Sequence, residues 1–183
     1  HLNSLGQKMI LTGNEIYKEV KNGNVVIEPF SAENLDPNSY AFHIGNEIIE
    51  YDSDRQRILD AKKEIVYKKI KIPEEGYILK PGKFYLASTY EKMGSNIYAK
   101  SLLANFSTSS CGMWIQFSAP LGHMGAIINW TLEIMVAQEM VVYPYMRIGK
   151  LAFWDTLGER EYYSGKYVGS DGVVSSRIQE DFT

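Results

Sequence analysis

The stretch YILKPGKFYLA, residues 77–87, decides the fold class of this chain. Two short runs of aromatic and branched apolar residues flank a Lys-Pro-Gly-Lys turn. Aromatic and branched side chains are typical of β-strands, and Pro followed by Gly is typical of a tight turn. The stretch therefore predicts a strand at residues 77–79, a turn, and a second strand from Phe84 that resumes the sheet.

Similar short strands are expected on both sides of this stretch. Turn residues recur at short spacing, and strands do not alternate with long helices, which argues against βαβ units. One helix is expected at the start, because Thr12 and Glu15 have capping-box spacing and residues 22–24 (NGN) end the helical pattern. The remaining predicted strands are 25–27, 40–45, 65–72, 113–117, 126–136, 140–142 and 148–153. We predict a mainly β fold, a distorted jelly roll or β-barrel with a short N-terminal helix.

Composition narrows the class of protein. The 183 residues suffice for one domain with its own core, which we expect to span residues 9–183, with residues 1–8 as a tag or leader before Met9. A net charge of −3 argues against a nucleic-acid polymer as partner. No apolar run reaches the roughly 18 residues that a membrane span needs. The single cysteine, Cys111, excludes an intrachain disulfide, and we predict a cytoplasmic protein.

Two features of the last third of the chain suggest a functional site. The segment NWTLEI, residues 129–134, places Glu133 on an apolar strand, where an acid is costly to bury unless it is paired or functional. Strand alternation puts Glu133 on the opposite face from its two neighbours, but it leaves open whether that face meets solvent or a site. The tail segment YYSGKYVG, residues 162–169, suits closure over an anionic ligand. Together these features predict a nucleotide site between strands and a lid.

The residues present disfavour zinc-dependent deamination and nucleophilic hydrolysis. Zinc deaminases combine an H-x-E sequence with P-C-x-x-C, whereas the histidines here are His1, His43 and His123, with one cysteine. The serine-rich segment 107–112 lacks the G-x-S-x-G elbow, and His123 is its nearest candidate base. We therefore predict no zinc and no protein-bound metal.

Several segments, in order from Met9 almost to the C-terminus, resemble the dCTP deaminase family of the dUTPase-like superfamily. Residues 9–16 are similar to the family's MILSDxDI motif, and residues 80–91 are similar to its HPGEFVLASTxE motif. The other similar segments are 36–45, 131–134, 143–151 and 165–178. The resemblance implies a dUTPase-like distorted jelly roll, in agreement with the strand pattern.

The resemblance also implies a homotrimer with sites between subunits and a metal-independent deamination of a pyrimidine deoxynucleotide. Glu133 matches the family glutamate that activates water for attack on cytosine C4, and Ala119 matches the residue whose backbone carbonyl helps to hold that water. A carboxylate suits this role because it can take a proton and return it within one pocket. Lys166 and Tyr167 match the tail that closes over the triphosphate, where Mg²⁺ bridges phosphate oxygens. Tyr163 in the same tail is a further candidate for substrate binding.

The active-site motif diverges from the family pattern in residues 104–113. Residues 104–113 can be aligned without gaps on the family's GRSSxxRLGL segment. In this alignment Asn105 and Ser110 replace the two arginines, Phe106 replaces the first serine, and Ser107 is kept. Asparagine and serine cannot replace the bidentate charge of arginine. We predict that the two substitutes, together with Ser107, line a site of altered specificity.

The turn that contacts deoxyribose diverges as well. The family's IDPG becomes residues 122–125 here, so that His123 stands in place of an aspartate, and His43 stands in place of an arginine. Either a different substrate occupies the same fold, or the site has lost its activity and the trimer binds nucleotide or a protein partner. Retention of the glutamate, the alanine and the tail lysine favours a working site.

Three functional hypotheses follow. The leading one is metal-independent hydrolytic deamination of dCTP, or of a related or modified cytosine deoxynucleotide, to the uracil form with release of ammonia. The second is a dUTPase-like nucleotide pyrophosphatase, which needs an aspartate where His123 stands. The third is a non-catalytic nucleotide-binding or regulatory trimer. Ammonia, pyrophosphate or neither, measured after incubation with nucleotides, distinguishes the three.

Overall fold

The computed structural model describes residues 9–115 and 118–182. The expected tag or leader residues 1–8, and the expected end of a strand at Phe117, lie outside the described residues. The predicted N-terminal helix is confirmed as α1, Gly13–Lys21. The Thr12 hydroxyl caps this helix by accepting a hydrogen bond of 3.3 Å from the backbone N–H of Glu15. Ile16 is fully buried, so the helix is anchored to the core through its apolar face.

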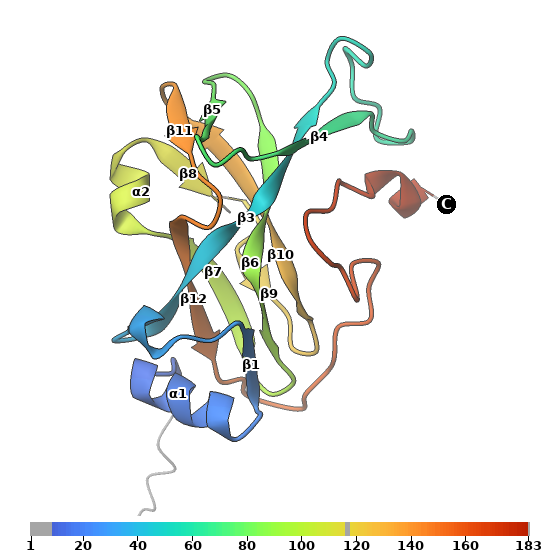
Figure 1. The fold of residues 1–183 in the computed structure, drawn as a ribbon. Helices are drawn as coiled ribbons and strands as arrows, with labels where there is room; N and C mark the ends of the chain where they lie inside the picture. Colours follow the sequence, from blue (N-terminus) through green and yellow to red (C-terminus); the bar gives the residue numbers. More distant parts are fainter. Residues whose placement is uncertain (1–8, 116–117, 183) are drawn as a thin grey trace, which may run out of the picture.

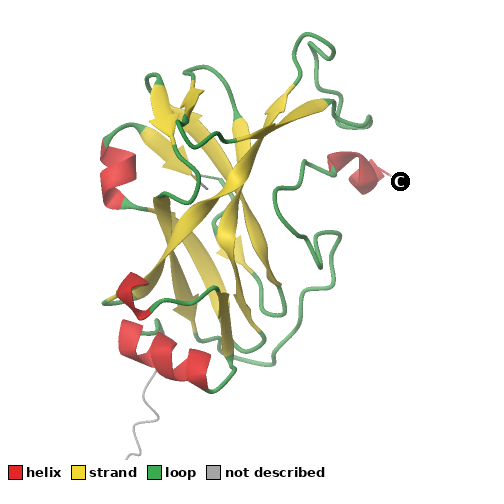
Figure 2. Cartoon of the chain, viewed as in Figure 1, coloured by secondary structure: helices red, strands yellow, loops and turns green. Residues whose placement is uncertain are grey.

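Strands β1–β12 make up most of the structured part of the described chain, as Figure 2 shows. Their bounds are β1 Val25–Glu28, β2 Leu35–Asp36, β3 Ser39–Tyr51, β4 Tyr67–Lys71, β5 Tyr77–Leu79, β6 Tyr85–Ser95, β7 Ala99–Ala104, β8 Met113–Ile115, β9 Leu121–Gly122, β10 Ile127–Val136, β11 Met140–Val142 and β12 Arg147–Trp154. The shorter helical elements are η1 Ala32–Asn34, α2 Phe106–Ser110 and η2 Ile178–Phe182.

Ten of these strands form one antiparallel sheet that curls around the core (Figure 1). The neighbour order is β8-β10-β6-β3-β12-β7-β9, with β1 also beside β6, and with β2 and β4 beside β3. The long strand β3 turns the sheet, because residues 40–43 pair with β12 whereas residues 44–50 pair with β6. The prediction of a mainly β fold with a curled sheet and a short N-terminal helix is confirmed.

The hydrophobic core lies inside this curl. Tyr40 and Phe42 of β3 and Phe153 of β12 are fully buried. Leu132 and Ile134 of β10 belong to the same buried cluster. Because successive side chains of a strand point to opposite faces, the residues between them on β10 point away from this core.

The stretch 77–87 forms a strand, a turn and a strand as predicted, but the two strands lie in different sheets. β5 pairs with β11 in a separate two-stranded sheet, whereas β6 belongs to the large sheet. The backbone N–H of Lys80 donates to the Tyr85 hydroxyl at 2.9 Å, and Gly82 adopts a φ of 76°, a backbone conformation that glycine accommodates readily. The turn therefore carries the chain from one sheet to the other, and the expectation that it resumes the same sheet is wrong.

The long tail after β12 crosses the outer side of β10 and ends in η2 (Figure 1). Val173 is buried against Ile49 and Leu86. The backbone N–H of Val174 donates to the Thr131 hydroxyl of β10 at 3.3 Å. These contacts fix the tail over the face of β10 that points away from the core. Within the described residues, no helix has the length and apolar character that a membrane crossing needs.

Candidate functional site

Glu133 lies on the tail-facing side of β10. Its neighbours Leu132 and Ile134 are fully buried in the core, whereas Thr131 and Glu133 are only partly buried. The question that alternation left open is therefore answered: Glu133 faces neither the core nor open solvent, but a cavity beneath the tail.

This cavity has a volume of about 540 Å³, within the range of about 300–1,000 Å³ that is usual for small-molecule sites. Its walls come from β10, from the segment that contains β9, and from the tail. The lining residues are Tyr51, Phe84, Leu86, Ala119, Leu121, His123, Ala126, Ile128, Trp130, Thr131, Glu133, Tyr163, Tyr167, Ser170, Val174, Ser175 and Ser176. Aromatic faces beside one carboxylate suit a planar, partly polar ring such as a pyrimidine.

A register shift brings Glu133 into the same cavity as the start of β10. The pairing of β10 with β6 is interrupted between Asn129 and Thr131. Ala126 and Ile128 line the cavity before this point, and Thr131 and Glu133 line it after this point, so the cavity-facing positions change from even to odd numbers. Irregularities of this kind re-aim side chains and are frequent beside active sites. Strict alternation along the sequence could not have predicted the shift.

Lys100 of β7 stabilises the turn that carries His123. The Lys100 ammonium donates to the backbone carbonyls of His123 and Ala126, the latter at 3.0 Å, and lies 5.4 Å from the centroid of the Trp130 ring. Lys100 is fully buried, and this burial lowers its pKa to about 8. On the solvent side the His123 ring stacks on Tyr163, with centroids 5.7 Å apart. Lys100 is thus a positioning residue for one wall of the cavity.

We expect Lys100 to make the protein more stable as the pH rises from about 7 to about 9.5. Its folded-state pKa of about 8 lies below the ordinary value of 10.5, so the unfolded chain binds this proton more tightly. Below the folded-state pKa, Lys100 is protonated in both the folded and the unfolded protein, and the folded state carries the full cost of burying this charge. Above that pKa the folded lysine loses its proton first, and the cost is relieved. Urea unfolding should show a gain of about 1–2 kcal/mol over this range. A gain of the same size in the Lys100→Met variant would contradict this expectation.

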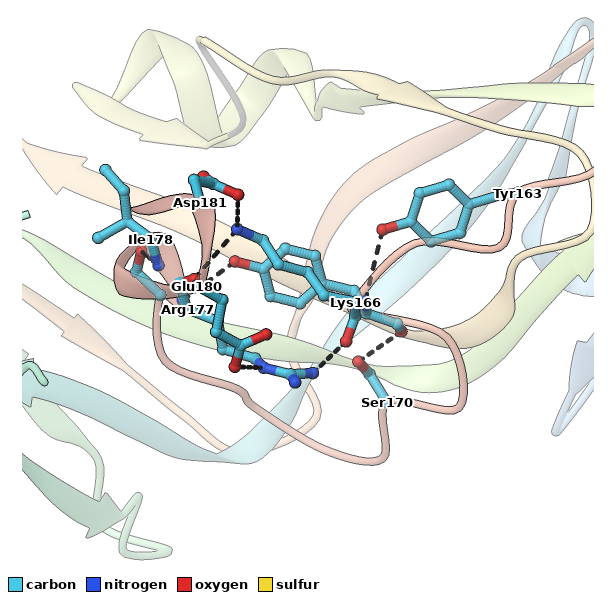
Figure 3. A network of polar contacts seen from close by, with 9 residues as sticks. Tyr163, Lys166, Ser170, Arg177, Ile178, Glu180 and Asp181 are labelled. Atoms are coloured by element: carbon cyan, nitrogen blue, oxygen red, sulfur yellow. Dashed lines mark hydrogen bonds and ion pairs between the residues drawn. The ribbon is translucent and has the colours of Figure 1, made fainter. Parts of the chain in front are cut away.

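The tail cations are bound to groups of the tail itself (Figure 3). The Lys166 ammonium lies 2.6 Å from an Asp181 carboxylate oxygen and donates to the Arg177 carbonyl at 3.0 Å. The Arg177 guanidinium donates to Glu180 at 2.6 Å and to the Lys166 carbonyl. These carboxylates raise the pKa of Lys166 and of Arg177, because each favours the charged form of its partner.

The structure brings five of the predicted site residues together and leaves four outside the cavity. Those that line it are Glu133, Ala119, His123, Tyr163 and Tyr167. Those that do not are Lys166, in the network just described, and Asn105, Ser107 and Ser110. The last three lie at and within α2, which is on the other side of the molecule from the tail (Figure 1). The roles given to all nine stay predictions.

Sequence reasoning missed several lining residues, of which Tyr51 is the most informative. It stands at the end of β3, distant in sequence from Glu133, and reaches the cavity only because the sheet curls. Burial raises the pKa of the Tyr51 hydroxyl; a hydrogen bond with the Ser176 backbone opposes this rise, and the Glu133 carboxylate adds to it. Tyr51 is therefore a neutral hydroxyl beside the Glu133 carboxylate. No local sequence signal marks a contact made by such distant strands.

Comparison with solved structures identifies the fold class first. The chain superposes on a crystal structure of 2′-deoxycytidine 5′-triphosphate deaminase from Agrobacterium tumefaciens with a TM-score of 0.63 and 14% sequence identity. The match covers 82% of this chain, which spans about half, 49%, of that chain. At this identity the likeness establishes the fold alone.

Sequence comparison then gives the family. Residues 10–156 match the dCTP deaminase-like family. A protein named dCTP deaminase, dUMP-forming, from Clostridium beijerinckii is 40% identical over 175 residues, which cover 95% of this chain and 99% of that protein. A protein of the same name from Hathewaya histolytica is 41% identical with the same coverage of both chains. The chain belongs to the dCTP deaminase-like family.

Proposed function

We propose that this chain hydrolytically deaminates the cytosine ring of dCTP or of a related deoxycytidine compound, with release of ammonia. The observation that carries the proposal is the position of Glu133, a carboxylate on the wall of a largely aromatic and apolar cavity of suitable size. Ala119 lines the same cavity, as a water-holding carbonyl requires. The relatives at about 40% identity are named as dCTP deaminases, which supports the same assignment.

In the proposed reaction the bond between cytosine C4 and its exocyclic amino nitrogen is replaced by a C4–O bond. Glu133 takes a proton from a water that the Ala119 carbonyl also holds, while the water oxygen bonds to C4. The proton passes to ring nitrogen N3, which gives a tetrahedral intermediate. Glu133 then moves the remaining hydroxyl proton to the amino group, the C4–N bond breaks, and ammonia leaves as the C4 carbonyl forms. One carboxylate can serve both transfers because base and acid roles alternate within one turnover.

Mg²⁺ enters this proposal only with a phosphorylated substrate. Among residues 9–115 and 118–182, no three His, Cys, Asp or Glu side chains are grouped so that they could hold a metal ion. Mg²⁺ is usually held by one or two carboxylates together with substrate phosphates, so the phosphate oxygens would supply ligands to the ion where a substrate carries phosphates. No step of the proposed deamination passes through it.

We also propose the homotrimer with sites between subunits. Asn105, Ser107 and Ser110 do not line the cavity of their own chain, yet they border an exposed surface on which Phe106 is 82% exposed. An exposed aromatic side chain of this kind is favoured at protein interfaces. The arrangement suits contact of this surface with a neighbouring subunit near its cavity. Sedimentation of the purified protein as a single chain would contradict the trimer.

The name of the relatives favours one alternative, because a dUMP-forming enzyme that starts from dCTP must release pyrophosphate as well as ammonia. This second activity is the dUTPase-like pyrophosphatase reaction. In this chain His123, stacked on Tyr163, stands where the family resemblance expects the aspartate for that step. A histidine in this position argues for deamination alone.

One assay tests the proposed function against its alternatives. The protein is incubated with deoxycytidine, dCMP, dCTP and dUTP in the presence of Mg²⁺, and ammonia and pyrophosphate are measured. We expect ammonia from at least one cytosine compound and no pyrophosphate from dUTP. Pyrophosphate without ammonia would instead support the pyrophosphatase, and neither product with measurable nucleotide binding would support a regulatory trimer.

A further inference from the structure

We infer that Thr89 and Asn129 are positioning residues that hold the Glu133 carboxylate at the cavity. This role rests on the proposed function, because it concerns the same reaction. Neither residue lines the cavity itself. Both act through the register of the two neighbouring strands that carry them, β6 and β10.

β6 has two extra residues where it passes β10. Asn129 of β10 pairs with Lys92 of β6. Two residues later on β10, but four residues away on β6, Thr131 pairs with Ser88. Residues 89–91 of β6 therefore face a single residue of β10 and form a β-bulge.

This bulge determines where Glu133 lies along β6. Glu133 pairs with Leu86 in the structure. If the pairing of Asn129 with Lys92 continued without a bulge, Glu133 would instead pair with the residue two positions away, which is about 7 Å along an antiparallel strand. Because a misplacement of about 1 Å can cost about 10²-fold in rate, the reaction depends on the contacts that stabilise the bulge.

The buried hydroxyl of Thr89 links the bulge to β10. Thr89 is 1% exposed. Its Oγ1 atom accepts a hydrogen bond of 2.9 Å from the backbone N–H of Trp130 and donates one of 2.7 Å to the backbone carbonyl of Glu91. Both backbone groups lie where the pairing of the strands is interrupted, and loss of their partner would destabilise this backbone conformation. One hydroxyl thus satisfies a group on each strand.

The Asn129 side chain supports the bulge from the side of β10. Its amide nitrogen donates to the backbone carbonyl of Thr89 at 3.0 Å and to that of Tyr90 at 3.1 Å. A side-chain amide carries two N–H donors, so it can satisfy both carbonyls. Together the Thr89 hydroxyl and the Asn129 amide bind four backbone groups of the interrupted segment, in place of the hydrogen bonds of a regular sheet.

The other side of the bulge is fixed to β3, since β6 lies between β3 and β10 in the sheet (Figure 1). Glu91 is 2% exposed. Its carboxylate accepts a hydrogen bond of 2.9 Å from the backbone N–H of His43 and lies 2.5 Å from the Nδ1 atom of the same residue. Because Glu91 holds the bulge against β3, the Thr89 hydroxyl contacts β10 from a fixed position.

The first test measures ammonia release from dCTP with Mg²⁺ for Thr89→Val and Thr89→Ser. Valine keeps the shape of threonine without the hydroxyl, whereas serine keeps the hydroxyl. We expect kcat to fall by at least about tenfold in Thr89→Val, with KM changed by less than about threefold, because the reacting carboxylate is displaced. Thr89→Ser should stay within about threefold of the unaltered protein. Equal kcat values for the two variants, or a loss confined to KM, would overturn the inference.

Leu79→Ala is the control for a general loss of stability. Leu79 is fully buried on β5, which lies outside the large sheet, and it does not line the cavity. At a temperature at which each variant is folded, this truncation should leave kcat unchanged. An equal loss of kcat in Leu79→Ala and in Thr89→Val would show that reduced stability lowers the rate, against a positioning role.

Asn129→Leu removes the support from β10 and gives an independent result if Thr89→Val does not fold. Leucine is similar in size to asparagine but offers no donor to the two backbone carbonyls. We expect kcat to fall by about three- to tenfold, a smaller loss than for Thr89→Val, because Asn129 is only partly buried and water can replace part of its hydrogen bonds. An unchanged kcat would contradict the inference.

Crystal structures of the unaltered protein and of Thr89→Val separate this inference from the proposed function. We expect the Glu133 carboxylate to move by at least about 1 Å between the two, with altered pairing of Glu133 with Leu86. If the unaltered protein releases no ammonia from any cytosine nucleotide, the proposed function fails, and this displacement still decides the positioning role. A smaller displacement would overturn the inference.

Discussion

Replacement of Glu133 by glutamine is expected to lower the rate of ammonia release by at least about 10²–10⁴-fold. Glutamine keeps the shape of the side chain but can neither take a proton from water nor return one to the amino group. Because Glu133 lies on the tail-facing side of β10, away from the buried cluster of Leu132 and Ile134, binding of dCTP should change by no more than about threefold. The ammonia assay and calorimetric titration measure the two quantities on the same preparation.

The matched control for this change is Glu139→Gln. Glu139 is exposed in the turn between β10 and β11, outside the cavity lining, so the control makes the same chemical change away from the site and should keep the rate of the unaltered protein. Equal rates for Glu133→Gln and the unaltered protein would remove Glu133 from the mechanism.

Replacement of the neighbouring residue, Leu132, is expected to lower the stability of the fold. Leu132→Ala should lower the free energy of unfolding by about 2–5 kcal/mol, because Leu132 is fully buried in the main core cluster and its truncation leaves a cavity there. Urea unfolding followed by tryptophan fluorescence measures the change. The loss reports on the core face of β10, just as the Glu133 variant reports on its tail-facing side.

Leu132→Met is the control for this prediction, since it nearly conserves volume and should cost less than about 1.5 kcal/mol. A loss below about 1 kcal/mol for Leu132→Ala would mean that Leu132 does not pack in the core. The strand faces would then be reversed, and Glu133 would no longer point to the cavity.

Local signals predicted the elements that depend on neighbouring residues. The capping pair Thr12 and Glu15 correctly placed the start of α1, because a cap is an interaction over three residues. Apolar runs bounded by turn residues likewise indicated most of the strands. β7 was not expected, because Lys100 interrupts its apolar pattern, and the structure instead buries this lysine on two backbone carbonyls.

The candidate site depended on long-range structure that a sequence pattern does not carry. The apolar pattern of residues 129–134 singled out Glu133, and the family resemblance gave its role and added Ala119; the structure places both on one cavity. Tyr51 could not be found in this way, since it reaches Glu133 only through the curl of the sheet. The register shift after Asn129 was equally invisible, because it arises from the pairing of β10 with β6 and not from either strand alone.

The structure shows where the divergent segment around α2 lies relative to the cavity. Asn105, Ser107 and Ser110 lie apart from the cavity of their own chain, so in the proposed trimer they would meet a cavity only by contact with a neighbouring subunit. In the tail, Asp181 binds Lys166 and Glu180 binds Arg177.

The most direct measurement of the central claim is turnover of dCTP in water enriched in ¹⁸O, followed by mass spectrometry of the base of the product and by an ammonia assay. Attack of water on C4 predicts that the uracil base of the deoxyuridine product carries one ¹⁸O atom from solvent, that ammonia appears in equal amount, and that both products are lost together in Glu133→Gln. A deoxyuridine product whose base lacks the label, or equal formation of product by the Glu133→Gln protein, would contradict a Glu133-assisted hydrolytic deamination.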